Sequence, residues 1–237
     1  TDWRGIFVLL AAFTLAVALL IWFVVPERAG GQKRENLNEL WAGLAKVARS
    51  RQFWRIAFLA MTLLGPSVAI QGLWAAPGMR NMQGLAFTAI MAVGFLTFGV
   101  ASDRLARHGF TPERILYSAN LLGGLCLALL AAGVTTGAIA LWLLYNFVAT
   151  AGTVAYAILS KVFPQHLAGR VATSLNMGSF VAAFAIQYGF GAVLERFGSN
   201  ATGYSPAGYS LALGTVVVAQ VAALAFYAWR PRAVAAT

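Results

Sequence analysis

The segment GVASDRLARHG, residues 99–109, interrupts an otherwise apolar part of the chain with a cluster of ionisable side chains. It contains one acid, two arginines and a histidine, with a glycine at each end. Long apolar runs precede and follow it. This pattern is typical of a short polar connection at a membrane surface, and the rest of the chain indicates which surface that is.

The composition indicates a protein whose solvent is lipid. Of the 237 residues, 60% are hydrophobic and 10% are charged, whereas a soluble domain carries about a quarter charged residues. The net charge of +10 would suggest nucleic acid in a soluble protein. Here the cations lie only in short gaps between apolar runs, so we expect no nucleic-acid partner. The single cysteine, Cys126, lies within such a run and is interpreted as a buried apolar side chain.

The apolar runs are long enough to cross a bilayer as helices. A spanning helix needs roughly 20 apolar residues. The runs do not alternate between polar and apolar residues as the strands of a membrane barrel do, and a helix satisfies its own backbone groups in lipid. We therefore predict an all-α integral membrane protein with seven transmembrane helices. The predicted spans are residues 6–25, 56–76, 85–102, 115–133, 138–160, 171–194 and 209–229.

The distribution of lysine and arginine predicts the orientation. The segments that connect the predicted spans fall alternately on the two sides of the membrane. The segments on one side, together with the C-terminal tail, hold fourteen of the 17 basic residues, and the other side holds Arg4, Arg80 and Arg196. Positive loops face the cytoplasm. We therefore expect Thr1 outside and Thr237 in the cytoplasm, with residues 99–109 on the cytoplasmic side. The predicted location is the plasma membrane, which in a bacterium is the inner membrane.

The longest gap between spans predicts a helix on the membrane surface. Apolar residues recur at helical spacing from Leu37 to Val47, and Asn36 followed by Glu39 is a weak capping pattern. We interpret this stretch as an amphipathic helix at the inner surface. A partly ordered linker with chance periodicity is the alternative.

The polar segment resembles the loop signature of the major facilitator superfamily. Gly99, Asp103, Arg104 and Arg107 match a Gly-x-x-x-Asp-Arg-x-Gly-Arg pattern, while Ala106 departs from it. In the family this signature lies between the second and third helices of each six-helix half. The stretches DWRGIF (residues 2–7), IQGLWAAPGMRNMQGLA (70–86) and FPQHLAGRVATSLNMGSFVAAFAIQYGFG (163–191) also look like the family.

The resemblance implies a domain organisation. Residues 1–25 would be the last helix of an N-terminal bundle, and residues 26–55 the cytoplasmic linker with its surface helix. Residues 56–230 would form the C-terminal six-helix bundle, and residues 231–237 a cytoplasmic tail. The first five helices of the N-terminal bundle would lie upstream of this chain and would be its partner.

The same resemblance implies a conformational latch formed by Gly99, Asp103, Arg104 and Arg107. At the inner end of a span, the carboxylate of Asp103 could accept hydrogen bonds from the N-terminus of a neighbouring helix, where the helix dipole favours an anion. In the family such a loop joins the two halves when the cavity opens outward. The alternative is that these residues are ordinary topological anchors, although an acid adds nothing to a positive-inside distribution.

Amide and indole groups inside the spans are the candidates for lining a substrate cavity, because transporters of this kind bind substrate near the midplane. Interhelical hydrogen bonding is the alternative for such groups, and we favour it for Ser67 and for Thr150 and Thr153. No Asp, Glu, Lys, Arg or His lies in the middle of a span, and no metal-ligand, cofactor or nucleophile pattern is present, so we expect no enzyme site. The candidates are Gln71, Trp74, Asn146, Asn176 and Gln187.

These observations predict a secondary active transporter of a small solute, whose partners are the lipid bilayer, the N-terminal bundle and a small-molecule substrate. A seven-helix membrane receptor or sensor is the alternative, and a membrane assembly protein without flux is another. A retinal protein needs a lysine within a span, and Lys33, Lys46 and Lys161 all lie near or in the cytoplasm.

Overall fold

The computed structural model describes residues 3–25, 36–71, 82–200 and 203–229, and most of them are helical. The chain divides into two compact units, Thr1–Leu40 and Trp41–Thr237. The first unit contains α1 (Trp3–Val24), and α2 (Leu37–Ala48) begins in it and ends in the second. The predicted all-helical fold class is confirmed. The second unit continues with α3 (Arg51–Ala69), α4 (Met82–Arg107), α5 (Pro112–Ala131), α6 (Ala138–Ala149), the 3-10 turn η2 (Thr150–Thr153), α7 (Val154–Val162), the 3-10 turn η3 (Gln165–Leu167), α8 (Ala168–Arg196), the short antiparallel strands β1 (Ser199–Asn200) and β2 (Gly203–Tyr204), and α9 (Pro206–Ala228).

Within the described residues, five helical segments are long and apolar enough to cross a membrane. A shorter apolar stretch, Ala86–Val100, lies within α4. The predicted span 56–76 is described only as far as Gln71: α3 ends at Ala69, and Ile70 and Gln71 are in a π turn. The count of seven spans therefore stays a prediction. The five segments are Arg4–Val24, Pro112–Ala131, Ala138–Val162, Gln165–Arg196 and Pro206–Ala228.

Two helix boundaries differ from those expected, because local caps move them. The hydroxyl of Ser50 accepts a hydrogen bond from the N–H of Phe53 at 3.2 Å and begins α3 at Arg51, so the last residues assigned to the linker form the first turn of this helix. At the other boundary, α4 continues through Arg107 and the chain turns at Gly109, whose φ of 81° suits glycine. The predicted Asp-Arg loop is therefore helical as far as Arg107.

The predicted linker helix is present as α2. The Asn36 N–H donates to the Glu39 carboxylate at 3.2 Å, one half of the capping pattern read from the sequence. The part of α2 that belongs to the second unit packs closely there. Val47 is fully buried, and the Arg170 guanidinium occupies the space where Gly43 would carry a Cβ. Trp41 remains exposed. The apolar stripe of α2 is thus only partly covered, and the position of this helix on the membrane surface stays a prediction.

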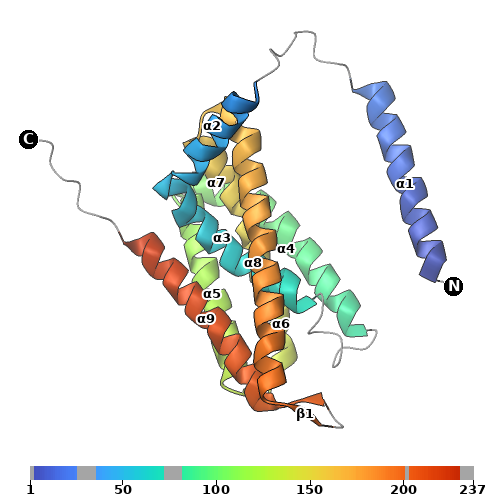
Figure 1. The fold of residues 1–237 in the computed structure, drawn as a ribbon, viewed down its shortest axis with the longest axis vertical. Helices are drawn as coiled ribbons and strands as arrows, with labels where there is room; N and C mark the ends of the chain where they lie inside the picture. The colour runs from blue at the N-terminus through green and yellow to red at the C-terminus, as the bar shows by residue number, and fades with distance from the viewer. Residues whose placement is uncertain (1–2, 26–35, 72–81, 201–202, 230–237) are drawn as a thin grey trace, which may run out of the picture. The chain divides into compact units, whose positions relative to one another are not determined.

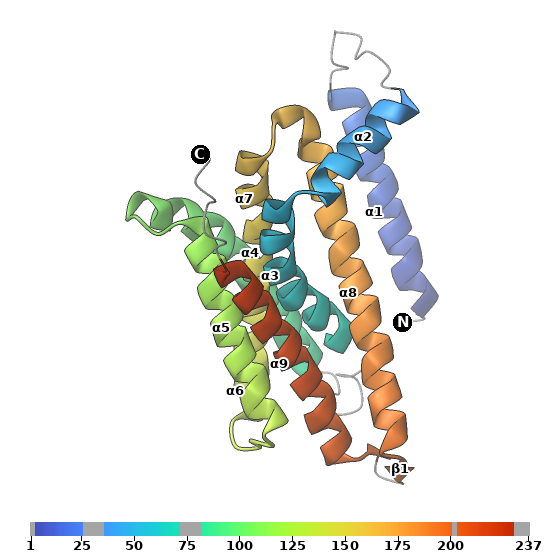
Figure 2. The same cartoon turned by 60° about the vertical axis from the view of Figure 1, so that its left-hand side comes forward.

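Helix α3 lies in the middle of the second unit, where it contacts α5, α6, α7, α8 and α9 (Figures 1 and 2). Its side chains Leu59 and Leu63 are fully buried. Lipid is as apolar as leucine, so burial alone gives helices little reason to associate, and close packing and polar bonds matter more. At Gly65 a Cβ would lie 3.0 Å from the Ala182 Cβ of α8, so the glycine lets these two helices approach closely.

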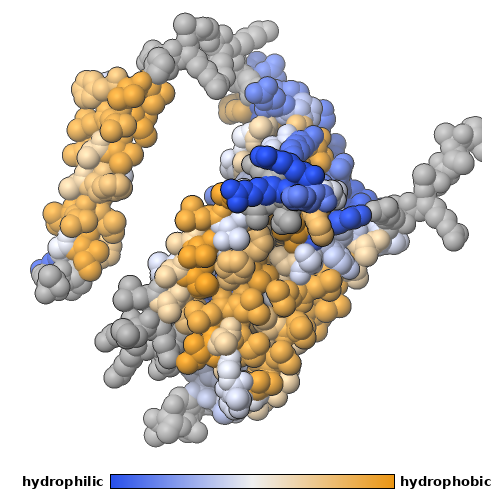
Figure 3. Space-filling view, turned by 180° about the vertical axis from the view of Figure 1, so that it is seen from behind, coloured by the Kyte–Doolittle hydropathy of each residue, from blue (hydrophilic) through white to orange (hydrophobic). Residues whose placement is uncertain are grey.

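Cations gather at one end of the second unit. Hydrophilic side chains cover this end, while the flank of the unit is apolar (Figure 3). The opposite end carries the α5–α6 turn and the β1–β2 hairpin (Figure 1). Arg196 ends α8 at that opposite end. The cationic end carries Lys46, Arg49, Arg51, Arg104, Arg107, Arg114, Lys161 and Arg170 at the adjoining helix ends.

Candidate functional site

Two of the predicted cavity residues meet in one hydrogen-bonded cluster. The Gln71 Nε2 atom, at the end of α3, lies 2.8 Å from the Asn146 Oδ1 atom on α6 and 2.9 Å from the Ser67 hydroxyl. The Ser67 hydroxyl donates to the same Asn146 oxygen at 3.2 Å. Met91 on α4 adds a thioether sulfur 3.0 Å from the Gln71 nitrogen. Three helices therefore meet at this point, and we call the three polar residues carried by α3 and α6 (Ser67, Gln71 and Asn146) the amide cluster.

Burial divides the amide cluster into a fixed part and an open part. Asn146 and Ser67 are 3% and 2% exposed, whereas Gln71 is exposed. The Asn146 Nδ2 atom donates to the Trp142 carbonyl at 2.9 Å, which fixes the orientation of its amide. The expected interhelical bonding of Ser67 is present. Asn146 and Ser67 thus hold the exposed amide of Gln71, which can hydrogen-bond a neutral polar group.

Both helices that carry the amide cluster depart from regular α geometry beside it. On α3, Pro66 lacks an N–H and leaves the Thr62 carbonyl without its helical donor. The backbone then widens into a π turn at Ile70 and Gln71. On the other side, Asn146 is followed by η2, a 3-10 stretch in the middle of a spanning segment. Such irregular turns within helices frequently mark hinges and functional sites.

Gln187 contacts α3 beside the cluster, whereas Asn176 contacts a different helix. The Nε2 atom of Gln187 on α8 lies 3.4 Å from the carbonyl oxygen of Ala69, which is two residues before Gln71 in the chain. Asn176 is exposed, and its Oδ1 atom lies 3.5 Å from the Tyr156 hydroxyl. The two amides lie on one side of α8 at different levels, because eleven residues of helix rise about 16 Å. Trp74 lies outside the described residues.

A second set of buried polar groups was absent from the sequence prediction. Asn120 on α5 and Gln220 on α9 are both fully buried. The Asn120 Nδ2 atom donates to the Leu59 carbonyl at 2.9 Å, and the Gln220 Nε2 atom donates to the Thr62 carbonyl at 3.2 Å. Both amides lie within predicted spans, so a search for every mid-span amide would have found them. The sequence does not reveal that both amides donate to carbonyl groups of the same helix, α3.

Gln220 supplies the bond that Pro66 removes. The Thr62 carbonyl that it meets lies four residues before Pro66, where a helical N–H would otherwise donate. The other amide atom of Gln220, Oε1, is buried and has no hydrogen-bond partner in the described part of the chain. The Tyr145 hydroxyl is directed at the next carbonyl, that of Leu63, at 3.4 Å. Side chains of α6 and α9 therefore form hydrogen bonds with the carbonyl groups in the irregular part of α3.

The latch motif lies on the last two turns of α4. Gly99, Asp103 and Arg107 are four residues apart, which places them on one face of the helix. Arg104 and Arg107 are exposed, and a Cβ at Gly99 would meet no atom within 4 Å in the described chain. The side chain of Asp103 lies outside the described part of the structure. The face that carries Gly99 is open enough for a partner surface.

The chemistry available at the amide cluster is neutral hydrogen bonding. Its polar groups are two amides and a hydroxyl, none of which titrates in the physiological range. Among the residues that the structure describes, no group of three or more His, Cys, Asp or Glu side chains could hold a metal ion. The interhelical bonding expected of the two threonines is not what the described part of the chain shows: Thr150 donates to Phe147 O and Thr153 to Thr150 O, both at 2.7 Å and within their own segment.

The comparison with family models gives one match. The model of the Major Facilitator Superfamily matches residues 1–187. That range includes the amide cluster, the motif on α4 and Gln187. A search of curated proteins finds no match.

Proposed function

This chain belongs to the Major Facilitator Superfamily, and on that premise we propose that it is a secondary active transporter that moves a small solute across the membrane by alternating access. The observation that carries the proposal is the amide cluster, placed where α3 and the α6–α7 segment both lose regular geometry. Transporters commonly bind substrate at interrupted helices within the bilayer. A receptor without transport is not favoured by membership of a transporter family.

The proposed substrate interaction is a hydrogen bond to an uncharged part of the solute. Gln71 is the exposed member of the amide cluster, and Asn146 and Ser67 hold it. Gln187 reaches the same turn of α3 from α8 and is the proposed second wall of the cavity. Trp74 and Asn176 remain predicted cavity residues. Because the predicted spans of the C-terminal bundle hold no Asp, Glu, Lys, Arg or His in their middle, the coupling ion or any countercharge would be bound by the N-terminal bundle.

The proposed topology follows the distribution of charge. The cationic end of the second unit would face the cytoplasm of the plasma membrane, in accord with the positive-inside rule. Residues 1–25 would then belong to the N-terminal bundle, residues 26–55 to the linker, residues 56–230 to the C-terminal bundle and residues 231–237 to the tail. The face of α4 with Gly99 and Asp103 would meet the N-terminal bundle on the cytoplasmic side.

A transport screen tests the proposed function directly. The whole protein, reconstituted into vesicles, should take up at least one member of a panel of labelled sugars, peptides, organic acids and drugs. Uptake should saturate and should accelerate when unlabelled solute is loaded on the far side, because alternating access exchanges bound solute across the bilayer. Specific ligand binding without any flux or exchange would contradict the proposal and would favour a receptor.

Replacing Asp103 by asparagine should slow transport about two- to fivefold, since a carboxylate at a helix N-terminus contributes about 0.3–1 kcal/mol. The amount of protein in the membrane should not change. The matched control is Glu113→Gln, which removes another acid at the same end, in the first turn of α5. Initial rates of solute uptake check the prediction. Normal uptake by Asp103→Asn, or equal slowing by Glu113→Gln, would remove the latch proposal.

A further inference from the structure

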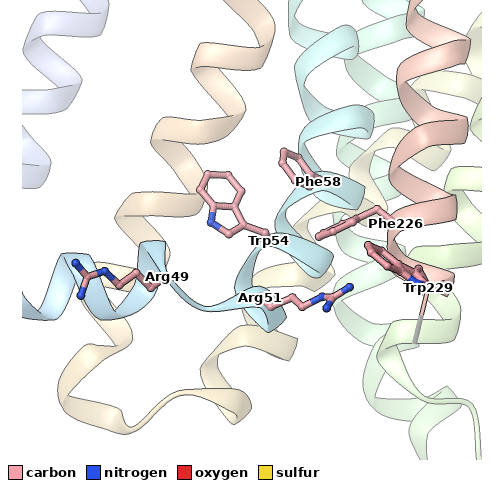
Figure 4. Close-up of a pocket in the computed structure, with 6 residues that line it drawn as sticks. All are labelled: Arg49, Arg51, Trp54, Phe58, Phe226 and Trp229. Atoms are coloured by element: carbon pink, nitrogen blue, oxygen red, sulfur yellow. The ribbon is translucent and has the colours of Figure 1, made fainter. Parts of the chain in front are cut away.

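A hollow lies between the start of α3 and the end of α9, away from the amide cluster (Figure 4). It has a volume of about 510 Å³. The two helices are held together here by Arg55, whose Nε atom donates to the Tyr227 carbonyl in the last turn of α9 at 3.2 Å. A cation is favourable at the C-terminus of a helix. The side chains that line the hollow are Arg49, Arg51, Trp54, Phe58, Phe226 and Trp229.

One side of the hollow is an aromatic wall. The ring centroids of Trp54 and Phe58 are 5.1 Å apart, and those of Phe58 and Phe226 are 5.7 Å apart. The indole N–H of Trp54 already donates to the Ala48 carbonyl at 2.7 Å. The wall therefore presents apolar surface and no free donor. Such a surface is suited to an alkyl chain and gives nothing to a small polar ion.

The other side of the hollow is cationic. The Arg51 guanidinium lies over the Trp229 ring at 4.6 Å from its centroid, and near Phe226 at 5.9 Å (Figure 4). These ring contacts orient the charge while Arg51 stays exposed. Arg49 lies on the far side of Trp54 (Figure 4). Among the described side chains, no carboxylate lines the hollow or pairs with Arg51.

The position of the hollow selects a ligand with two chemically different parts. It lies at the cationic end of the second unit, at the start of α3 and the end of α9, and is lined by both arginines and aromatic side chains. An anionic headgroup can meet Arg51 while an acyl chain follows Trp54, Phe58 and Phe226. We propose that this hollow is a binding site for one anionic phospholipid, which bridges α3 and α9. The proposal requires only that the protein lies in a lipid bilayer, so its test is independent of the transport proposal.

The test is native mass spectrometry of the whole protein in detergent, with added phosphatidylglycerol or phosphatidylcholine of identical acyl chains. One phosphatidylglycerol should stay bound at concentrations where phosphatidylcholine does not. Arg51→Gln should weaken this binding at least fivefold, since one cation near a membrane surface is worth about that factor toward an anionic lipid. The matched control is Lys161→Gln, which removes an exposed cation at the same end but outside the hollow. It should change the affinity less than twofold.

A second variant tests the aromatic wall. Phe58 is 37% exposed, so Phe58→Gln should leave the fold intact and still weaken lipid binding. Glycerophosphoglycerol, the headgroup without acyl chains, should fail to compete. Equal loss in the Arg51 and Lys161 variants would show diffuse charge attraction and overturn the site. Equal binding of phosphatidylcholine, or full competition by the free headgroup, would overturn it as well.

Discussion

Replacing Gln220 by methionine should destabilise the protein when Pro66 is present and have little effect in a chain that carries Pro66→Ala. Pro66 deprives the Thr62 carbonyl of its helical donor, and the Gln220 Nε2 atom at 3.2 Å replaces that donor. An unpaired buried polar group costs about 1–3 kcal/mol. In the Pro66→Ala chain, the new N–H of residue 66 reaches the Thr62 carbonyl and makes Gln220 dispensable.

Thermal unfolding of the four proteins in detergent measures this coupling as a double-mutant cycle. The expected interaction is about 1–2 kcal/mol, which for a chain of this size corresponds to a shift of about 2–8 °C. The cycle also cancels the gain from removing the unpaired Oε1 atom of Gln220, because both backgrounds lose it.

Asn120 supplies the control for this cycle. It is as deeply buried as Gln220 and also donates to a carbonyl of α3, that of Leu59. The helical donor of Leu59 O is the N–H of Leu63, which the proline at position 66 does not affect. Asn120→Leu should therefore cost the same with and without the Pro66→Ala substitution. Equal costs for Gln220→Met in both backgrounds would mean that its bond does not compensate for the proline.

Replacing Asn146 by leucine should reduce transport roughly 10- to 100-fold while the protein still reaches the membrane. The Asn146 Oδ1 atom accepts from both Gln71 and Ser67, so the substitution leaves the buried Ser67 hydroxyl without this acceptor and removes one of the groups that orient Gln71. Losing about 1–3 kcal/mol of polar interaction corresponds to such a factor in rate. Uptake of the solute found in the transport screen is the measurement, corrected for the amount of protein in the membrane.

Thr150→Val is the matched control for this substitution. Thr150 is fully buried one turn further along the same segment, and its hydroxyl donates only within that segment, to Phe147 O at 2.7 Å. Transport should stay within about twofold of the unmodified protein. The transport rate of Gln71→Leu should lie between those of Asn146→Leu and Thr150→Val. Because Gln71 is exposed, the unfolding temperature of this variant should hardly change. Undiminished uptake by Asn146→Leu would exclude the amide cluster from the transport path.

The sequence predicts local features of the site well and contacts between helices poorly. Ser67 and Gln71 are four residues apart, so helical periodicity alone places them on one face. That Asn146 meets them depends on how α3 packs against α6, which no local pattern encodes. Asn176 and Gln187 illustrate the same limit, because periodicity gives their shared side but not the level at which each meets a neighbouring helix.

Two helix boundaries depend on caps that hydropathy does not reveal. Ser50 caps α3, which begins at Arg51 and so precedes the predicted span, and Gly109 lets α4 continue through the polar motif. Hydropathy marks where a chain is apolar, whereas a helix ends where its terminal backbone groups find other partners. Gln220, whose donor compensates for Pro66, is 158 residues away from Thr62 in sequence.

That separation has a consequence for biogenesis. The ribosome delivers α3 to the membrane long before α9, so the open Thr62 carbonyl is inserted without its eventual donor. Until Gln220 emerges, water in the translocation machinery or a lipid headgroup has to solvate that oxygen. Assembly of the second unit is therefore completed only when α9 inserts, and ribosome-stalled chains that lack α9 should be preferred clients of membrane chaperones.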